Sequence, residues 1–369
     1  LINFCYFNYI YILMKLIQRN KDLVNNSKDL EHLYTYKNFP IFMGSTLSKK
    51  SSDKKTDMVW MIGKKTGMIQ LKNLIPLKIL YHQNHNSGVV GKLWEAHHNQ
   101  FANFICKHKL NNILEIGGGH GSLSQKILKK KKDKIKYTII EVNQDKKFKN
   151  VKYIKSFFDE RFIKKNNNYD TVIFSHLLEH VYDINLFLKQ LSKLQKKTKI
   201  FVSIPNMKEM ILKNYVNVLN FEHTYYLNES FLNYFLNKHS FQIDKRYKFK
   251  SDHSLFYLIR RKNNIKKKVI KNYYTYNKKI FLNFVNKNQR EIFKINDKIK
   301  KNRNTFLFGG HIFSQYMLSN GLHAKNIKYI LDNDKFKQGK RLYGTDLTIM
   351  SPNVIKKVRK PIVVLRAGV

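Results

Sequence analysis

Strand and helix patterns alternate between residues 110 and 205, and this alternation limits the fold more than any other feature of the chain. Apolar runs typical of strands are followed by amphipathic stretches typical of helices. The expected strands lie at 111–117, 135–142, 169–175 and 198–206, and the expected helices at 121–130 and 184–194. Such alternation predicts an α/β fold with a parallel, Rossmann-like sheet and helices on both faces.

The flanking segments predict two further domains in the 369-residue chain. Residues 14–100 contain short apolar patches and a polar stretch, so we expect a small irregular N-terminal domain. Residues 227–261 predict a helix and an antiparallel strand pair, which complete a central domain at 101–260. A lysine-rich helical connector and a second α/β unit then form a third domain at 261–369.

Two expectations concern the two ends of the sequence. Leu1 is the first residue, and no positive charge precedes the apolar run before Met14 as it would in a signal peptide. We expect Met14 to be the true start and residues 1–13 to be a translated upstream extension. An apolar strand at 361–369 should lead into another helix, so we expect truncation there.

The formal net charge of +45 indicates nucleic acid or an anionic surface as a partner. The lysines are scattered, however, and Lys, Asn, Ile, Tyr and Phe are abundant together, as an AT-rich coding sequence produces. We therefore interpret the charge as compositional drift that also favours anionic small ligands. Nucleic acid is not expected as the substrate.

Cysteine content and hydropathy exclude several classes of protein. The two cysteines, Cys5 and Cys106, are too few for a disulfide framework or a cysteine zinc site, and they favour the reducing cytoplasm. No apolar run approaches the roughly 20 residues that span a bilayer. We expect a cytoplasmic protein without a membrane partner.

Residues 113–121 read ILEIGGGHG and connect the first expected strand to a helix. Glycine permits positive φ and lets a ligand touch the backbone, and a helix start offers free N–H groups. Gly117, Gly119 and Gly121 form G-x-G-x-G, whereas the dinucleotide pattern has its third glycine one position later. With Glu115 two positions before the first glycine, the stretch resembles motif I of class I S-adenosylmethionine-dependent methyltransferases.

Two further stretches fit this resemblance. Glu141 ends the second expected strand, where a carboxylate can accept hydrogen bonds from both ribose hydroxyls. The segment 169–181, YDTVIFSHLLEHV, resembles the methyltransferase pattern of a strand followed by a polar segment ending in Glu-His. The resemblance implies S-adenosyl-L-methionine as the cofactor, with Ser175 and His176 beside it.

Residues from about 60 to 369 also resemble the three-part sugar C-methyltransferases, through NFEHTYYLNESF at 220–231 and FLFGGH and DNDKFKQGK in the last domain. That family holds zinc in its N-terminal domain with two C-x-x-C pairs, but this chain has Gly63 and Thr66 where the second pair should lie. The zinc-binding domain is therefore degenerate, and we expect no metal. The chain also has Asn220 where an aromatic residue is common.

The family resemblance implies C-methylation of a nucleotide-linked keto sugar through an enolate. His223 is then the expected base, because a neutral imidazole can remove a proton next to a ketone. Glu222 lies beside it, and His180 with Glu179 could stabilise the developing oxyanion. His97 also matches a family position, with a helix-surface role equally open.

Three alternatives remain open from the sequence. An O-methyltransferase acting on a polysaccharide precursor differs only in the acceptor atom. A nucleic-acid methyltransferase would suit the charge, but SIPN at 203–206 lacks the aromatic residue of amine methylases, and Cys106 precedes the glycine motif. A binding protein that has lost catalysis is the third reading.

Overall fold

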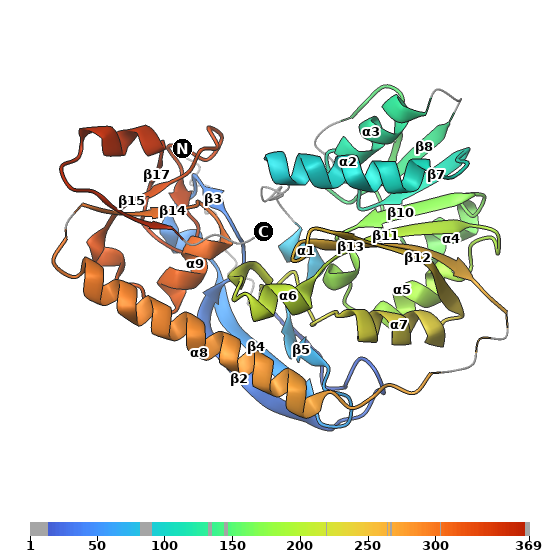
Figure 1. The fold of residues 1–369 in the computed structure, drawn as a ribbon, viewed down its shortest axis with the longest axis horizontal. Coiled ribbons are helices and arrows are strands. Elements are labelled where there is room, and N and C mark those ends of the chain that lie inside the picture. Colours follow the sequence, from blue (N-terminus) through green and yellow to red (C-terminus); the bar gives the residue numbers. More distant parts are fainter. Residues whose placement is uncertain are drawn as a thin grey trace, which may run out of the picture.

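The structure, a computed structural model, describes residues 14–81, 91–131, 135–143, 147–218, 220–263, 265, 268–302 and 304–365. The predicted upstream extension, residues 1–13, lies outside these ranges. Three parts follow one another along the chain, and a central mixed sheet with its helices is the largest of them (Figure 1).

The central sheet has seven strands, five of them parallel. The parallel strands come first in the chain, and an antiparallel pair then closes one edge. This sheet confirms the predicted Rossmann-like α/β fold. Across the sheet the order is β12 (Phe241–Phe249), β13 (Ser254–Arg261), β11 (Lys199–Pro205), β10 (Thr171–Ser175), β7 (Asn112–Ile116), β8 (Lys136–Ile140) and β9 (Lys152–Ile154).

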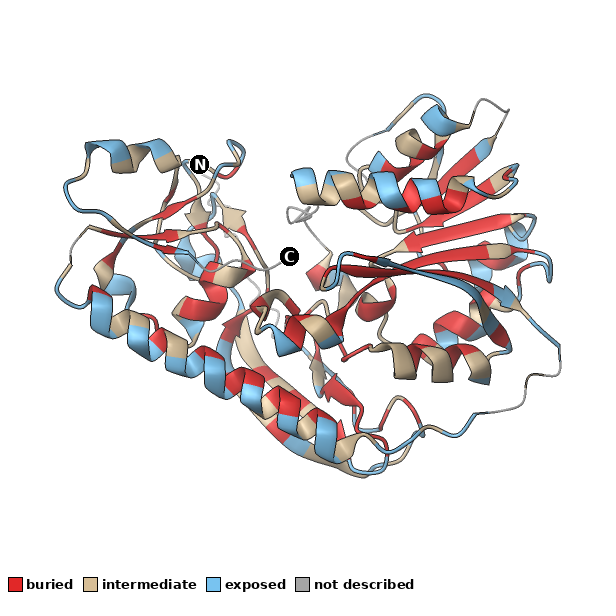
Figure 2. Cartoon of the chain, viewed as in Figure 1, coloured by how far each residue is buried: buried red, intermediate tan, exposed pale blue. Residues whose placement is uncertain are grey.

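Helices cover both faces of the sheet (Figure 1). One face carries α2 (Lys92–Cys106) and α3 (Ser122–Lys130), and the other carries α4 (Glu160–Lys165), α5 (Ile184–Leu191) and α7 (Glu229–Lys238). The buried residues concentrate where helices meet strands (Figure 2). The predicted boundary at residue 100 falls inside α2, whose Phe101 and Ile105 pack in the core of the central domain.

The N-terminal part is a sheet and not the irregular segment expected from its sequence. Strands β2 (Leu30–Pro40), β4 (Lys55–Gly63) and β5 (Ile69–Leu71) form an antiparallel three-stranded sheet. Met58, Trp60 and Ile62 are buried in alternation along β4. The charged residues before Met58 hid this two-residue period in the sequence. The shorter elements here are β1 (Ile17–Gln18), β3 (Ser45–Thr46), β6 (Asn73–Leu74) and α1 (Leu77–Leu80).

The expected connector contains one long helix, α8 (Tyr274–Ile299), that packs along the N-terminal sheet. Phe281 of α8 lies 5.9 Å from Trp60 between ring centroids. The helix therefore buries a face on the N-terminal sheet and does more than link two domains. Figure 1 shows it running in front of β2 and β4.

The C-terminal part is a second, smaller α/β unit. Its sheet has the order β17 (Ile349–Met350), β15 (Ile327–Leu331), β14 (Thr305–Phe308) and β18 (Ile362–Leu365), with all pairs parallel, and α9 (Ile312–Ser319) follows β14. The short strand β16 (Arg341–Leu342) pairs with β3 of the N-terminal part. Arg341 also donates to both oxygens of the buried Asp53 carboxylate, at 2.6 and 2.7 Å. The N-terminal and C-terminal parts are therefore packed together.

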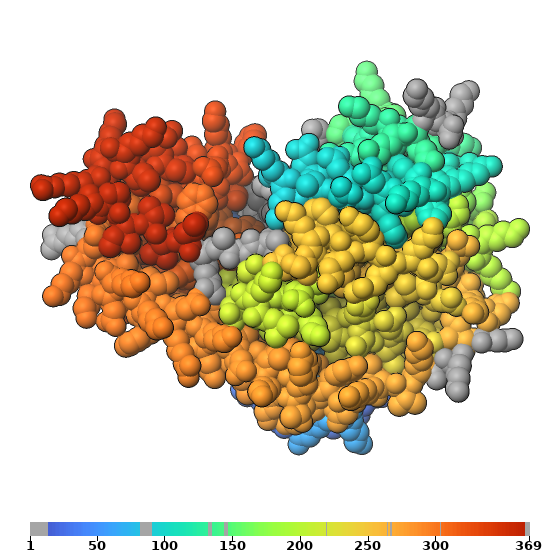
Figure 3. All heavy atoms as spheres, viewed as in Figure 1, coloured from blue at the N-terminus to red at the C-terminus, as the bar shows by residue number. Residues whose placement is uncertain are grey.

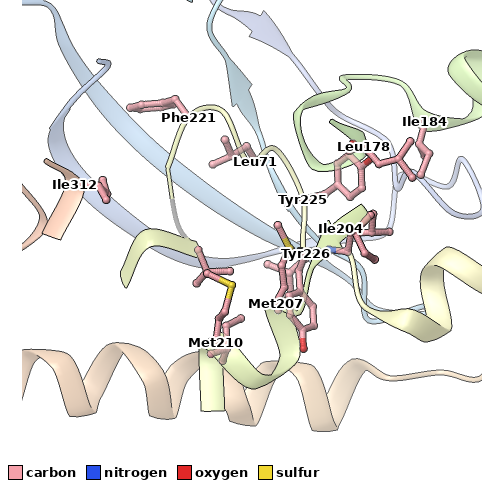
Figure 4. Packing of buried hydrophobic residues seen from close by; sticks show 14 of the residues in the cluster. Leu71, Leu178, Ile184, Ile204, Met207, Met210, Phe221, Tyr225, Tyr226 and Ile312 are labelled. Carbon is pink, nitrogen blue, oxygen red and sulfur yellow. Dashed lines mark hydrogen bonds between the residues drawn. The ribbon is translucent and has the colours of Figure 1, made fainter. Parts of the chain in front are cut away.

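One apolar core joins the three parts. Leu71 of the N-terminal sheet, Tyr225 of the central part and Ile312 of the C-terminal unit belong to the same cluster (Figure 4). The segment from β11 to α7, including α6 (Met207–Leu212), lies at the junction. Within the described residues, no helix combines the length and the apolar character that a bilayer span requires.

Candidate active site

The glycine loop joins β7 to α3 in a backbone conformation that needs glycine. Gly117, Gly119 and Gly121 have φ of 72°, 49° and 72°, in the left-handed region that side chains disfavour. Gly118 has no positive φ, but a Cβ there would lie 2.8 Å from Ile139 Cγ2 and 3.1 Å from Glu115 Cδ. Three glycines are thus needed for the turn, and the fourth for close packing.

Glu115 lies behind this loop, at the end of β7. Its side chain is buried, and Tyr137 donates a hydrogen bond to Oε2 at 2.9 Å. Burial raises the pKa of Glu115 to about 8, although the Tyr137 hydrogen bond acts in the opposite direction. The carboxyl group therefore packs against the buried side of the glycine loop, and Glu115 also lines a large cavity.

A cavity of about 720 Å³ opens between the three parts of the chain. The N-terminal part contributes Met43 and Tyr81, and the C-terminal part contributes His311 and Phe313. On the face drawn in Figure 3, the C-terminal unit and α2 stand on either side of a notch in the surface. The central domain supplies most of the lining, including Gly117, Gly119, Glu141, Ser175, His176, Glu179, His180, Glu222 and His223.

Glu141 lies at the tip of β8 beside the glycine loop. Its Oε1 accepts hydrogen bonds from the backbone N–H groups of Val142 and Asn143 at 2.8 and 3.0 Å. Its Oε2 accepts from Gly119 N–H at 3.2 Å. These bonds fix the carboxylate at the edge of the cavity, and its binding of ribose stays a prediction.

The loop after β10 and the loop after η3 (Val216–Val218) bring two Glu-His pairs together. His180 Nδ1 lies 3.4 Å from Glu222 Oε2, and its Nε2 lies 3.8 Å from Glu179 Oε1. The rings of His180 and His223 are perpendicular, with centroids 5.0 Å apart. Residues 179–180 and 222–223, which are far apart in sequence, therefore form one cluster, the Glu-His cluster.

His223 is held in a defined orientation. Its Nδ1 lies 3.2 Å from the carbonyl oxygen of Val218, which can only accept, so Nδ1 carries the proton and donates. The side chain of Asn220 accepts from the N–H groups of Glu222 and His223 at 2.8 and 2.9 Å. Asn220, the departure from the family pattern, thus shapes the turn that presents the Glu-His pair.

Burial changes the protonation of the whole cluster. It lowers the pKa of His223 to about 4 and that of His180 well below its usual range. It raises the pKa of Glu222 to about 7 and that of Glu179 to about 8. The two imidazoles are therefore neutral at pH 7, and the unprotonated Nε2 of His223 has the form a general base requires.

Several lining residues were missed by the sequence analysis. Tyr81, Trp94, His98, His253 and His311 come from four separate segments, and no local pattern connects them to the glycine loop. Glu179 was expected only as a helper, yet it is fully buried and neither carboxylate oxygen accepts a hydrogen bond within the described residues. For Trp94 on α2, the sequence offered no indication of a role in the site except that it precedes His97 by three positions.

Residues 90–245, less than half of the chain, match a family described as a methyltransferase domain. This match and the sheet topology identify the central part as a methyltransferase domain of the Rossmann-like class. The cofactor of this class is S-adenosylmethionine, as the glycine loop predicted. No curated protein matches the sequence.

Solved methyltransferase structures resemble the chain at low identity. Mitomycin 7-O-methyltransferase MmcR shares 14% identity with a TM-score of 0.37, covering 44% of this chain and 54% of its own. An O-methyltransferase family protein from Burkholderia thailandensis shares 6% identity with a TM-score of 0.38, and the match covers 46% of this chain and 57% of that protein. Magnesium protoporphyrin IX methyltransferase from Synechocystis shares 15% identity with a TM-score of 0.35, and the match covers 48% of this chain and 90% of that protein. This chain thus spans little more than half the length of the first two.

Proposed function

We propose that the chain transfers a methyl group from S-adenosylmethionine to the carbon next to the ketone of a nucleotide-linked keto sugar. The observation that carries this proposal is the state of His223. Its Nδ1 proton is held by the Val218 carbonyl, its imidazole is neutral, and it lines the same cavity as the glycine loop. A fixed neutral base next to a methyl donor is what enolate methylation needs.

In this proposal the cofactor lies along the glycine loop. The amino-acid part would rest against the turn at Gly117–Gly121, and the ribose hydroxyls would donate to Glu141. Ser175 and His176, at the end of β10, would border the sulfonium. The anionic and polar groups on this side of the cavity suit a cationic sulfonium better than a pyrophosphate.

Methyl transfer would follow in two steps. His223 Nε2 first takes the proton from the carbon next to the ketone, and the electron pair moves to the ketone oxygen. The enolate carbon then forms a bond with the methyl carbon as the methyl–sulfur bond breaks. Sulfur keeps that electron pair as S-adenosylhomocysteine, and the proton stays on the imidazole.

The enolate oxygen needs a hydrogen-bond donor, and the raised pKa of Glu222 gives it one. A carboxyl group with a pKa of about 7 is partly protonated at neutral pH and can donate to an oxyanion in a buried site. His180, whose Nδ1 lies 3.4 Å from Glu222, holds the acid in place. The hydrogen-bond donor, Glu222, and the general base, His223, would then be adjacent residues of one turn.

The charge of the cavity lining indicates which part of the substrate would enter the cavity. None of the described residues that line it is Lys or Arg. A diphosphate would therefore lie outside, where the lysine-rich surface can balance its charge, and the sugar ring would enter the cavity. Buried imidazoles and carboxyls suit a ketone and hydroxyls better than phosphates.

Deuterium exchange tests this proposal and separates it from O-methylation. Purified protein with S-adenosylhomocysteine and a bound nucleotide-linked 4-keto sugar should exchange the hydrogen next to the ketone in deuterated water. His223→Ala should slow both exchange and methyl transfer by about two to four orders of magnitude, the worth of a positioned base. S-adenosylmethionine affinity should stay near that of the wild type.

The controls decide between related outcomes. His32→Gln alters an exposed histidine of β2 and should change neither rate. Methyl transfer to a hydroxyl without any exchange would replace the C-methylation proposal with the O-methylation alternative. Exchange that survives in His223→Ala would retain the reaction and move the base to another residue.

A further inference from the structure

Three histidines from distant segments, two of them buried and His176 partly buried, meet at the wall of the cavity. His97 lies on α2, His176 follows β10, and His253 lies in the turn before β13. One ring nitrogen from each lies within 4.8 Å of the others. The ring centroids are 5.3 Å apart for His97 and His176, 5.3 Å for His97 and His253, and 6.0 Å for His176 and His253.

Serine hydroxyls hold these three rings in place. Ser203 Oγ lies 3.0 Å from His97 Nε2. Ser254 Oγ lies 2.8 Å from His176 Nε2 and 2.5 Å from His253 Nδ1. A metal-binding histidine usually donates its other ring N–H to a neighbouring polar group, and this bond sets the orientation of the ring.

Two ring nitrogens in this cluster have no hydrogen-bond partner. His97 Nδ1 and His253 Nε2 are buried, and no group in the described part of the chain contacts them at hydrogen-bond distance. The two histidines are 0% and 4% exposed, so bulk water does not solvate them. Burying such groups without a partner is unfavourable, so the cluster is suited to a ligand that both can bind.

We propose that His97, His176 and His253 form a binding site for one divalent transition-metal ion of the zinc type. Three imidazoles bound at 2.0–2.1 Å around a tetrahedral ion have ring centroids roughly 5 Å apart. The observed spacings are close to this, and small ring rotations complete the site. This site is separate from the lost cysteine site, whose residues lay in the N-terminal part.

The chemistry of the ligands selects the class of ion. Imidazole nitrogen suits Zn²⁺, Co²⁺, Ni²⁺ and Cu²⁺, whereas Mg²⁺ and Ca²⁺ require oxygen ligands, which this triad lacks. Three protein ligands leave a fourth position open. His176 and His253 both line the cavity, so the fourth position faces it. The carboxyl group of Glu179 lies beside the site, with Oε1 3.5 Å from His176 Nδ1.

Trp94 provides a built-in reporter for this site. Its indole lies 5.1, 4.9 and 4.9 Å from the rings of His97, His176 and His253. The chain has only two tryptophans, and the other, Trp60, is buried in the N-terminal sheet. An ion bound by the triad would lie next to Trp94, so Co²⁺ should quench the fluorescence of that residue.

The experiment titrates the chelator-treated full chain with Co²⁺ and then displaces Co²⁺ with Zn²⁺. We expect about one equivalent to bind, with visible d–d absorption of a four-coordinate site and quenching of tryptophan fluorescence. Trp94→Phe should remove the quenching and keep the absorption. Binding of less than one equivalent at micromolar ion, or absorption typical of a six-coordinate surface site, would overturn the proposal.

Variants assign the site to the triad. His97→Asn and His253→Asn should each lower Co²⁺ affinity at least 100-fold, whereas His32→Gln should bind as the wild type does. Circular dichroism and S-adenosylmethionine binding show that each variant is folded. Unchanged affinity in both folded triad variants would refute the site, whatever the enzyme's substrate proves to be.

Discussion

The carboxyl group of Glu115 is kept protonated by its surroundings, and this makes the stability of the protein depend on pH. The side chain is buried beneath the glycine loop, and burial is the main reason that its pKa rises from 4.5 to about 8. The negative charge of Glu141 acts in the same direction, and the hydrogen bond from Tyr137 acts against it. Glu115→Gln replaces this carboxyl with a neutral group of the same shape.

The size and sign of the effect follow from proton linkage. Below pH 4.5 the carboxyl is protonated in both the folded and the unfolded chain. As pH rises from 4.5 to about 8, the unfolded chain loses this proton and the folded chain retains it, so the free energy of unfolding falls. A shift of this size corresponds to about 3 to 5 kcal/mol between pH 5 and 8. Glu115→Gln should remove this loss.

The assay measures urea unfolding of the wild type and Glu115→Gln at pH 5, 6, 7 and 8. We expect the stability of the variant relative to the wild type to increase by about 3 to 5 kcal/mol across this range. Other buried carboxyls, such as Glu222, titrate equally in both proteins and cancel in the difference. Glu160→Gln, on the exposed start of α4, should follow the wild type. Parallel curves for all three proteins would refute the reasoning.

Two further predictions concern the glycine loop and its neighbour. Glu141→Ala should weaken S-adenosylmethionine binding by about 1.5 to 3 kcal/mol through lost hydrogen bonds to a charged group, and calorimetry showing wild-type affinity would remove Glu141 from the cofactor site. Gly118→Ala should lower stability by about 1 to 3 kcal/mol because its Cβ would overlap Ile139, whereas Gly119→Ala should cost only about 1 kcal/mol of backbone strain. Equal losses in thermal unfolding would contradict this ranking.

The central fold was predictable because its signals are local. The strands β7, β8, β10 and β11 are apolar runs next to turn residues, and the sheet confirms the alternation found in the sequence. β9 and α4 were missed because they span three and six residues, too few to establish a period. In β4, the lysines and Asp57 outweighed the alternation of Met58, Trp60 and Ile62.

The candidate site was predictable only in part. The glycine positions and Glu141 were identifiable because backbone conformation and strand ends leave a pattern at fixed spacing. His253 was not, because it reaches His97 and His176 only after the antiparallel strands fold back onto the sheet. The same applies to the pKa of Glu222, since the burial that raises it is created by residues from several segments.

Glu222 also leads to a prediction about the pH dependence of catalysis. The proposed role of Glu222 is to donate a hydrogen bond to the enolate oxygen, which requires its protonated form. Because its pKa is raised to about 7, the proton is lost as pH rises through neutrality, and kcat/KM should fall above pH 7. On the acid side, the pKa of His223 is about 4, so the base stays neutral and active at pH 5, where an ordinary histidine would be protonated.

Glu222→Gln separates this role from a structural one. Glutamine keeps the shape and one N–H donor but cannot lose a proton near pH 7, so the variant should retain activity at pH 6 and lose the decline centred near pH 7. Initial rates of methyl transfer between pH 5 and 9 measure this, with Glu160→Gln as the matched control that should keep the wild-type profile. A decline that stays at pH 7 in Glu222→Gln would assign the titration to another group and remove Glu222 as the donor. An acid limb near pH 6.5 would show that His223 is solvated during turnover, because only burial lowers its pKa to about 4.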